Sequence, residues 1–280
     1  MDGIKELYWL KVMKKAVVIP DQHFPIHDKG AFGCVLKTIE LVKPEIVINI
    51  GDVGEWEVVS HWAKKYSSLD LGFHLPLIDF EIGQVNEELD KIDEVCNKLN
   101  IKERYVTTGN HDIWLDQFVE NKVGEHSVLK DYTFLEACHW KSRGWEVLPM
   151  MKPLTIGKLS FIHGAFTNMY HTKKHLDTYG ASIIYGHTHT CQNFVKSRLD
   201  SGTIGAWSIG TIKSLKAKDN NFLRGRLHNW QHSVTIVNFW SNGNFQVEPI
   251  FINKGKCSVW GNEINGSWIR CSISLFKKTC

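Results

Sequence analysis

The sequence predicts one α/β domain with a predominantly β second half, in which two sheets pack between helices. Three observations predict this class. Short apolar runs alternate with apolar positions at helical spacing over the first part of the chain. Each of these runs ends at a polar turn, often next to glycine. The last third contains strand-like runs and a strong hairpin turn, Asn242-Gly243.

The first elements form a strand, helix and strand. Residues 16–19 are an apolar run that predicts a strand, and a polar turn follows at Asp21. Residues 46–50 are short, apolar and β-branched, and Gly51-Asp52 follows them, as is typical of a buried parallel strand. Between these runs, apolar positions at helical spacing predict a helix that ends near Pro44: Phe32, Val35, Leu36, Ile39 and Val42. The segment is therefore a predicted βαβ unit.

A second helix and strand follow in the same order. The helical stripe consists of Val85, Leu89, Ile92, Cys96 and Leu99. Residues 105–107 predict the next strand, which ends before Gly109. Residues 54–84 and 113–150 have no clean period and predict elaborated connections, which in a compact domain are more often functional than idle.

The remaining strands lie in the second half. Residues 159–162 and 183–185 are apolar runs that each end at a glycine beside a histidine. Further strands are predicted at residues 204–209, 234–239 and 245–252.

The composition is that of a globular protein. A chain of 280 residues buries roughly three quarters of the surface of its unfolded form. With 43% hydrophobic and 22% charged residues and only 7 Pro, the sequence excludes a mostly disordered or collagen-like chain. No apolar stretch approaches the roughly 20 residues that span a membrane, and no secretory signal is evident. We expect no membrane partner and a cytoplasmic location.

Charge divides the chain into three parts. Residues 1–15 carry a net charge of +2 and residues 254–280 carry +4, so residues 16–253 carry −3 of the total of +3. We expect an N-terminal extension at 1–15, the folded domain at 16–253 and a C-terminal basic tail at 254–280. The ends are predicted to be solvated, although basic ends could also assist contact with phosphate.

The seven cysteines are scattered and form no C-x-x-C pair. This pattern favours reduced thiols over a disulfide framework. A zinc site in the tail is the alternative for Cys257, Cys271 and Cys280.

Polar turns follow five of the predicted strands, and their residues offer oxygen and imidazole ligands. Carboxyl ends of parallel strands meet at one sheet edge, so these turns are expected to lie together. Such donors without thiolates suit Mn, Fe or Zn. The turns are Asp21-Gln22-His23, Gly51-Asp52, Gly109-Asn110-His111-Asp112, His163-Gly164 and Gly186-His187-Thr188-His189.

Each turn alone is compatible with an ordinary loop, and His163 alone with a hydrogen-bonded core histidine. His187 and His189 are more telling, because two imidazoles at i and i+2 after a strand are awkward to bury without a partner. The indication of a metal site comes from the five turns occurring together and in order.

This ordered set resembles the signature of the calcineurin-like metallophosphoesterases, D-x-H, GD, GNH(D/E), H and GHxH. The resemblance spans residues 21–189. It implies a four-layer α/β/β/α sandwich that holds two divalent metal ions, foremost Mn, with Fe, Zn or Ni as alternatives. It further implies that Asp21, His23, Asp52 and His189 hold one ion. The other would be held by Asp52, Asn110, His163 and His187, with Asp52 bridging.

The resemblance also implies a mechanism for phosphoester hydrolysis. A hydroxide that bridges the two cations would attack phosphorus in line. His111 would stabilise the developing charge and protonate the leaving oxygen, and Asp112 would hold the His111 ring. His111 and Asp112 are therefore the predicted catalytic residues.

The motif departs from the protein phosphatase branch of this family. That branch has GDxxDRG, whereas this chain has tryptophan at position 56 in place of the arginine and ends its histidine motif in Asp112. The departure favours a phosphodiesterase or nuclease acting on nucleotide or nucleic-acid esters. A phosphomonoesterase and a catalytically inactive scaffold are the alternatives.

A second resemblance, to metallophosphoesterases of phage genomes, rests on residues 51–62 and 224–232 and would place the protein in a host cytoplasm. Basic residues with tryptophan neighbours between 207 and 230 could grip phosphates and stack bases, or form a solvated loop beside core tryptophans. Those basic residues are Lys213, Lys216, Lys218, Arg224 and Arg226, flanked by Trp207 and Trp230. His61, Trp62 and His232 are candidates for lining a substrate cleft. The oligomeric state is not predicted.

Overall fold

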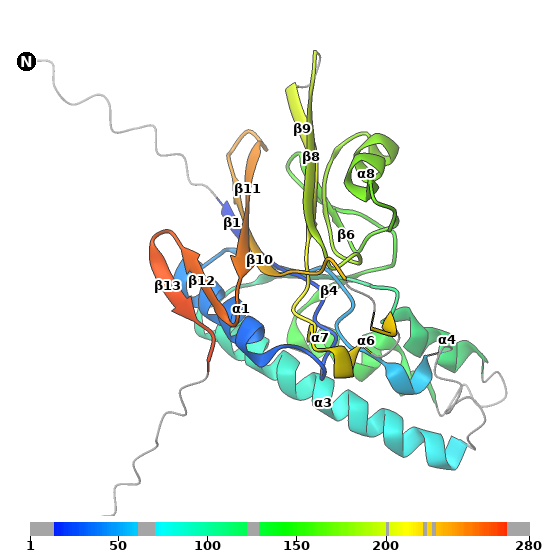
Figure 1. The fold of residues 1–280 in the computed structure, drawn as a ribbon. Helices are drawn as coiled ribbons and strands as arrows, with labels where there is room; N and C mark the ends of the chain where they lie inside the picture. The colour runs from blue at the N-terminus through cyan, green and yellow to red at the C-terminus, as the bar shows by residue number, and fades with distance from the viewer. Residues whose placement is uncertain are drawn as a thin grey trace, which may run out of the picture.

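The computed structural model describes residues 14–60, 71–121, 129–199, 202–220, 223–225 and 228–267 (Figure 1). Two large sheets and a small hairpin account for its strands. The first sheet has the order β11-β10-β1-β2-β3-β4, and the second has the order β5-β6-β7-β9-β8.

The first sheet is parallel at its centre. β1 pairs in parallel with β2, β2 with β3 and β3 with β4, whereas β10 runs antiparallel to both β1 and β11. Its strands are β1 (Lys14–Ile19), β2 (Ile46–Asn49), β3 (Glu103–Thr107), β4 (Glu146–Leu148), β10 (His232–Phe239) and β11 (Phe245–Ile252).

The second sheet has the same plan, with a parallel centre and antiparallel edges. β6, β7 and β9 are parallel neighbours, and β5 and β8 run antiparallel at the two edges. Its strands are β5 (Leu154–Ile156), β6 (Leu159–Ile162), β7 (Ser182–Tyr185), β8 (Cys191–Arg198) and β9 (Gly202–Ile209).

Three apolar clusters separate four layers. Alternation along β1 sends Val17 and Ile19 into the cluster under helices α1 (Lys29–Val42) and α3 (Leu71–Lys98). The same alternation sends Ala16 and Val18 into a second cluster, shared with Phe161 and Ile184 of the other sheet. A third cluster joins the second sheet to helix α8 (His171–Tyr179). The structure confirms the predicted α/β/β/α sandwich, with α1 and α3 on one side and α8 on the other (Figure 1).

Helix α1 follows its sequence pattern closely. Asp28 caps its N-terminus by accepting a hydrogen bond from the backbone N–H of Ala31 at 2.8 Å. Its apolar stripe is buried from Phe32 to Val42. Lys43 ends the helix in a left-handed conformation, one residue before Pro44.

Helix α3 reaches further toward the N-terminus than the predicted stripe, into the segment expected to be an irregular connection. The buried positions of this extra part include His74 and Glu81, and Pro76 lies inside the helix. His74 Nε2 donates to the carbonyl of Val58 at 2.7 Å, and Glu81 accepts from the backbone N–H groups of Glu57 and Val58. The hidden face is thus partly polar, which explains why apolar periodicity missed it.

Residues 113–150, also expected to be a connection, contain three helices and the edge strand β4 in their described parts, 113–121 and 129–150. The helices are α4 (Ile113–Asn121), α6 (Phe134–Ala137) and α7 (Trp140–Arg143). Short 3-10 turns occur at Glu57–Val59, Lys130–Tyr132 and Ala217–Asp219. Leu115 and Trp140 are among the residues of this region that are fully buried, so it completes the core under the first sheet.

Part of the expected C-terminal tail is folded onto the domain. β12 (Lys256–Val259) and β13 (Asn262–Asn265) pair as a hairpin that contacts α1. Cys257, Val259 and Ile264 are buried in the cluster under the first sheet. The prediction of a solvated tail starting at residue 254 is therefore wrong for residues 254–267. It relied on the net charge of the segment and overlooked these alternating apolar positions. Residues 1–13 and 268–280 lie outside the described residues. Within the described ranges, no helix is long and apolar enough to cross a membrane.

Candidate metal centre

All seven predicted metal ligands follow strands at the carboxyl edges of the two sheets. Asp21, Asp52 and Asn110 come after β1, β2 and β3 of the first sheet. His163 follows β6 of the second sheet, and both His187 and His189 follow β7. Because the sheets face each other, their loops meet at one end of the sandwich. His23, two residues beyond Asp21, completes the set.

Four of these residues have a left-handed backbone. The φ angles are 52° at His23, 47° at Asp52, 66° at His187 and 58° at His189. Non-glycine residues adopt this region rarely, at a cost that persists only where the surroundings enforce it, and such residues concentrate at functional sites.

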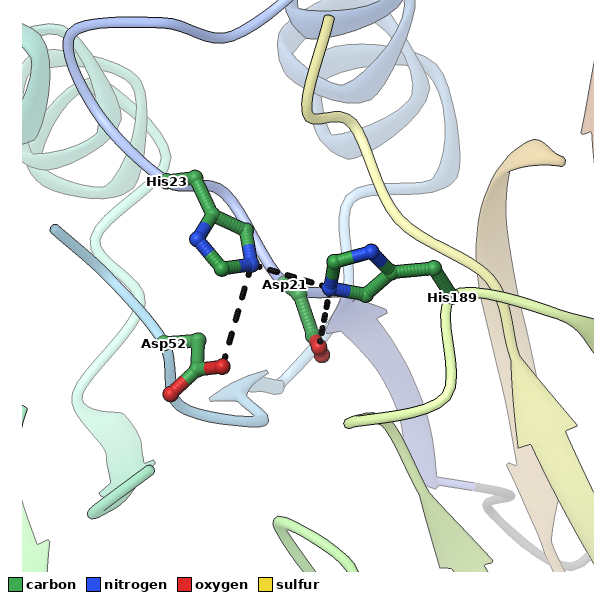
Figure 2. Close-up of side chains that lie close together, drawn as sticks. All are labelled: Asp21, His23, Asp52 and His189. Carbon is green, nitrogen blue, oxygen red and sulfur yellow. Dashed lines mark hydrogen bonds and ion pairs between the residues drawn. The ribbon is translucent and has the colours of Figure 1, made fainter. Parts of the chain in front are cut away.

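One group of ligand atoms comes from Asp21, His23, Asp52 and His189, all buried, and these atoms lie within 4.8 Å of one another (Figure 2). His23 Nε2 lies 2.9 Å from His189 Nε2 and 3.7 Å from Asp52 Oδ2. His189 Nε2 lies 3.3 Å from Asp21 Oδ2.

A second group contains Asp52, His163 and His187, again with one ligand atom from each within 4.8 Å of the others. His163 Nε2 lies 3.3 Å from Asp52 Oδ2 and 3.0 Å from the amide oxygen of Asn110. Its other nitrogen, Nδ1, donates to the carbonyl of Ile50 at 2.9 Å, which leaves Nε2 directed at the group. Asp52 belongs to both groups.

The donor set fits two divalent cations. Asp21 Oδ1 and His189 Nδ1 are buried and have no hydrogen-bond partner in the described part of the chain. His23 and His189 direct their Nε2 atoms at each other beside two carboxylates, a convergence that a shared cation satisfies. The ligands are imidazole, carboxylate and amide groups, as Mn, Fe or Zn would accept.

The charges of the two groups are strongly coupled. Burial alone raises the pKa of Asp52, but nearby His163, His111 and His23 lower it well below its usual value. Burial alone lowers the pKa of His163, but Asp52 and Asp21 raise it to about 10. Burial, together with Lys213, lowers the pKa of His23 to about 3.

Glycine is required at two places by close approach. A Cβ at Gly186 would overlap Oδ1 of Asp21, and a Cβ at Gly109 would overlap Oδ1 of Asp52. The glycines of the two motifs therefore make room for the carboxylates of the centre.

His111 lies beside the centre, but Asp112 does not hold its ring. The backbone N–H of His111 donates to Asp52 Oδ1 at 2.8 Å, and its Nδ1 donates to the carbonyl of Glu55 at 2.8 Å. Asp112 is fully buried and accepts hydrogen bonds from the backbone N–H groups of Val53 and Gly109 and from the indole of Trp56. Both oxygens of Asp112 thus accept from other groups, and the structure pairs His111 Nδ1 with the Glu55 carbonyl instead of the expected Asp112.

Other residues singled out in the sequence have different positions. Lys213 is buried against Glu55, and Trp207 packs on Phe245 between the sheets, so neither lies on an open basic surface. His232 is buried and donates from Nε2 to the carbonyl of Lys213. His61, Trp62 and Arg226 lie outside the described residues.

Sequence patterns did not indicate Glu55 or Trp114. Glu55 contacts His23 at 2.7 Å, and the Trp114 ring lies 4.0 Å from that of His111. The position of Glu55 three residues after Asp52, directly beyond the second motif, was the available signal.

The sandwich carries its polar loops at the carboxyl edges of both sheets, with Asp52 common to the two ligand groups. These layers and ligand positions are the ones that the resemblance to the calcineurin-like metallophosphoesterases implies. No protein-family model matches the chain.

Similar proteins include two from phages. The Gene 54 protein of Mycobacterium phage L5 is 24% identical over 277 residues, covering 89% of this chain and 97% of the relative. The Gene 54 protein of Mycobacterium phage D29 is 24% identical over 272 residues, covering 89% and 98%. Their source agrees with the weaker resemblance to phage proteins.

Solved structures with some similarity include three of low sequence identity. The phosphoesterase YfcE from E. coli is 14% identical, with a TM-score of 0.37 and coverage of 85% of this chain and 100% of that one. Chaetomium thermophilum Vps29 is 12% identical, with a TM-score of 0.35 and coverage of 85% of this chain and 97% of that one. A dimetal phosphatase from Danio rerio is 9% identical, with a TM-score of 0.40 and coverage of 91% of this chain and 99% of that one. At these scores, the four-layer architecture rests on the sheets and apolar clusters of this chain itself.

Proposed function

We propose that the protein is a dinuclear metal-dependent phosphoester hydrolase. The observation that carries the proposal is the place of Asp52 in both ligand groups. Its Oδ2 lies 3.7 Å from His23 Nε2 and 3.3 Å from His163 Nε2. A carboxylate between two sets of imidazoles is the arrangement that a pair of bridged cations needs.

Two bound divalent ions would supply an activated water nucleophile at neutral pH and neutralise charge on the phosphoester. Asp21, His23, Asp52 and His189 would hold one ion, and Asp52, Asn110, His163 and His187 the other. The choice of Mn, with Fe, Zn or Ni as alternatives, is part of the proposal. The Ile50 carbonyl accepts from Nδ1 of His163, which directs Nε2 of that ring at the second ligand group.

His111 is the proposed general acid. Its Nδ1 donates to the carbonyl of Glu55, so Nε2 is the atom that would hold a proton for the leaving oxygen. The ring is partly exposed and close to His23, with a centroid distance of 4.7 Å. A proton donor at this place would stabilise the charge that develops on the departing group.

We further propose that the substrate is a phosphodiester of a nucleotide or nucleic acid. Successive ring contacts link two partly buried tryptophans to the centre, through His111 and His23 from Trp114 and through His189 from Trp230. Trp114 lies 4.0 Å from His111, and Trp230 lies 4.5 Å from His189 and 4.6 Å from His228. Tryptophan beside a phosphate site can stack nucleobases, which supports this substrate class.

Charge on one loop supports the same class. Lys213 lies beside the centre, and Gln231, further along the chain, lies beside it again, where its N–H donates to the carbonyl of His189 at 3.0 Å. Lys216, Lys218 and Arg224, which lie between these two residues in the sequence, are exposed. Exposed cations anchored beside a hydrolytic centre suit a polyanionic substrate. The phage origin of the relatives supports a role in a cytoplasm, that of a host cell if the chain is viral.

The test begins with metal content and hydrolysis of bis-p-nitrophenyl phosphate in the presence of Mn²⁺. We expect two ions per chain and turnover that Asp52→Asn lowers by at least about 1000-fold, because charge stabilisation by two ions is worth several kcal/mol. Asp177→Asn, on a surface ion pair, is the matched control. Turnover that survives in Asp52→Asn would contradict the proposal.

A substrate panel separates the alternatives. Faster turnover of single-stranded DNA or cyclic nucleotides than of simple esters supports the diester proposal. A higher kcat/KM for p-nitrophenyl phosphate than for the diester would instead assign a phosphomonoesterase. Two bound ions with no turnover of any ester would assign a catalytically inactive scaffold.

A further inference from the structure

We propose that Lys213 and Glu55 form a buried ion pair that positions His23 for metal binding, an inference that rests on the proposed function. Glu55 and Lys213 lie outside the five motifs and are not proposed metal ligands. They would act through His23 and are therefore positioning residues.

The contacts form a chain of three side chains. Glu55 Oε2 lies 2.7 Å from His23 Nδ1. Lys213 Nζ donates to both oxygens of Glu55, at 2.8 Å each. The side chains of His23 and Lys213 are 0% and 2% exposed, and that of Glu55 is 17% exposed.

The contacts among Lys213, Glu55 and His23 select one tautomer of His23. The Glu55 carboxylate can only accept, so Nδ1 of His23 carries the proton and Nε2 presents its lone pair. Nε2 is the atom that lies near His189 and Asp52 in the first ligand group. A carboxylate behind a ligating histidine fixes its ring and raises its basicity.

Lys213 gives Glu55 a fixed charge and direction. A carboxylate with few water contacts is costly unless it is paired, and the ammonium group pairs both of its oxygens. The pair is neutral, so it leaves the net charge of the centre unchanged.

Hydrogen bonds also fix the backbone around Lys213. His232 Nε2 donates to the Lys213 carbonyl at 2.8 Å, and Lys213 N–H donates to Thr211 Oγ1 at 2.9 Å. Thr211 Oγ1 and the N–H of Ile212 both donate to the carbonyl of Asp21 at 2.8 Å. The segment that supplies Lys213 therefore also holds the loop that carries two of the ligands.

Two other roles for these residues fit less well. Atoms of His23, Glu55 and His111 lie within 4.8 Å of one another, which would suit a third cation. Lys213 Nζ, however, bonds both oxygens of Glu55 and brings its own positive charge. A substrate-gripping lysine would need exposure, and Lys213 is buried.

The experiment measures Mn²⁺ binding to the full chain by isothermal titration calorimetry. Glu55→Gln and Lys213→Met are each expected to weaken binding about 10- to 100-fold, the range for groups behind a ligand. The double variant should bind more tightly than Lys213→Met, because neutral Gln accepts from His23 without needing a cation. Lys196→Met, which breaks the exposed pair with Asp177, is the matched control and should bind as wild type does.

Nitrogen NMR of metal-free, ¹⁵N-histidine-labelled protein provides a readout that a merely structural role would not move. Wild type should show His23 protonated at Nδ1, and Lys213→Met and Glu55→Gln should show a mixture of tautomers. His23→Gln assigns the signal by removing it. Circular dichroism confirms that each variant is folded before it is titrated.

The outcomes separate this inference from the proposed function. Wild type that binds no Mn²⁺ would overturn the proposed function itself. Wild type that binds two ions, with Lys213→Met and Glu55→Gln binding within twofold of it and an unchanged His23 signal, would overturn only the role of the ion pair.

Discussion

Nδ1 of His111 donates to the backbone carbonyl of Glu55 at 2.8 Å, a bond in which the side chain of Asp112 takes no part. Asp112 instead accepts from the backbone N–H groups of Val53 and Gly109. The two predicted catalytic residues thus make separate contacts: His111 bonds the Glu55 carbonyl, and Asp112 joins the loops that follow β2 and β3.

His111→Ala should lower kcat about 100- to 10,000-fold while two metal ions remain bound, because general acid catalysis contributes about this much. The loss should be larger for an alkyl leaving group than for p-nitrophenolate, which departs without protonation. Kinetics on a matched pair of diesters checks this. Equal losses for both leaving groups would contradict a proton-donating His111.

Asp112→Asn should act through stability. Its carboxylate accepts three hydrogen bonds in a fully buried position, and the amide nitrogen of Asn would face a donor. We expect the free energy of unfolding to fall by about 1–3 kcal/mol. Urea denaturation measures this, with Asp177→Asn as the exposed control. A pH optimum shifted by Asp112→Asn in folded enzyme would indicate a direct contact with His111 after all.

Metal removal should lower the melting temperature. Buried Asp21 and Asp52 lie close together, and Asp21 Oδ1 has no partner among the described residues. Ligand at 100 times its Kd stabilises the fold by about 2.7 kcal/mol, which is roughly 5–10 °C for a chain of this size. Differential scanning calorimetry with Mn²⁺ and with EDTA measures the shift. In Asp52→Asn the shift should be much smaller.

Trp230→Leu should raise KM for a thymidine p-nitrophenyl diester about 5- to 100-fold, because stacking on a base contributes about 1–3 kcal/mol. KM for methyl p-nitrophenyl phosphate should rise much less, since it offers no base. Trp260→Leu, at a tryptophan that is 52% exposed on the β12–β13 hairpin, is the control. Equal effects on both esters would rule out base stacking at Trp230.

Glu81 should make stability depend on pH. Burial raises its pKa to about 7, above the unfolded value of about 4.5, so the folded protein keeps a proton that the unfolded chain releases. The free energy of unfolding contributed by Glu81 is therefore full below pH 4.5 and is lost as pH rises through 7. Relative to Glu81→Gln, wild type should lose about 1–3 kcal/mol between pH 5 and pH 8.

Urea denaturation in EDTA checks the Glu81 prediction, and Glu87→Gln on the exposed face of the same helix is the control. No change in the wild-type-to-variant difference across this pH range would show that Glu81 remains ionised in the fold.

The sequence predicted the parts of the fold in which local pattern and tertiary burial agree. β1, α1 and β2 were foreseen because their buried positions are almost all apolar. Helix α8 was missed because its buried positions are His171, Thr172, His175 and Leu176. Three of these are polar and find partners only in the folded protein, as His171 does with Tyr185.

The centre was predictable for a related reason. Each ligand directly follows a strand, so local order alone places it at the sheet edge. Lys213 could not be assigned this way, because its partner Glu55 is 158 residues away and nothing near Lys213 distinguishes it from the exposed Lys216. Pairing between loops depends on how the two sheets face each other, which single-sequence periodicity does not contain.

The β12–β13 hairpin lies directly on bare backbone of α1, since a Cβ at Gly33 would overlap Gly266. Truncating the protein before Lys254 would therefore uncover an apolar strip of α1, and larger side chains at position 33 would lift the hairpin off. Affinity tags or fusion partners are better joined beyond residue 267 than within the hairpin. Within the hairpin they would disrupt its packing on α1, the helix that packs against β1 and so supports the loop bearing Asp21.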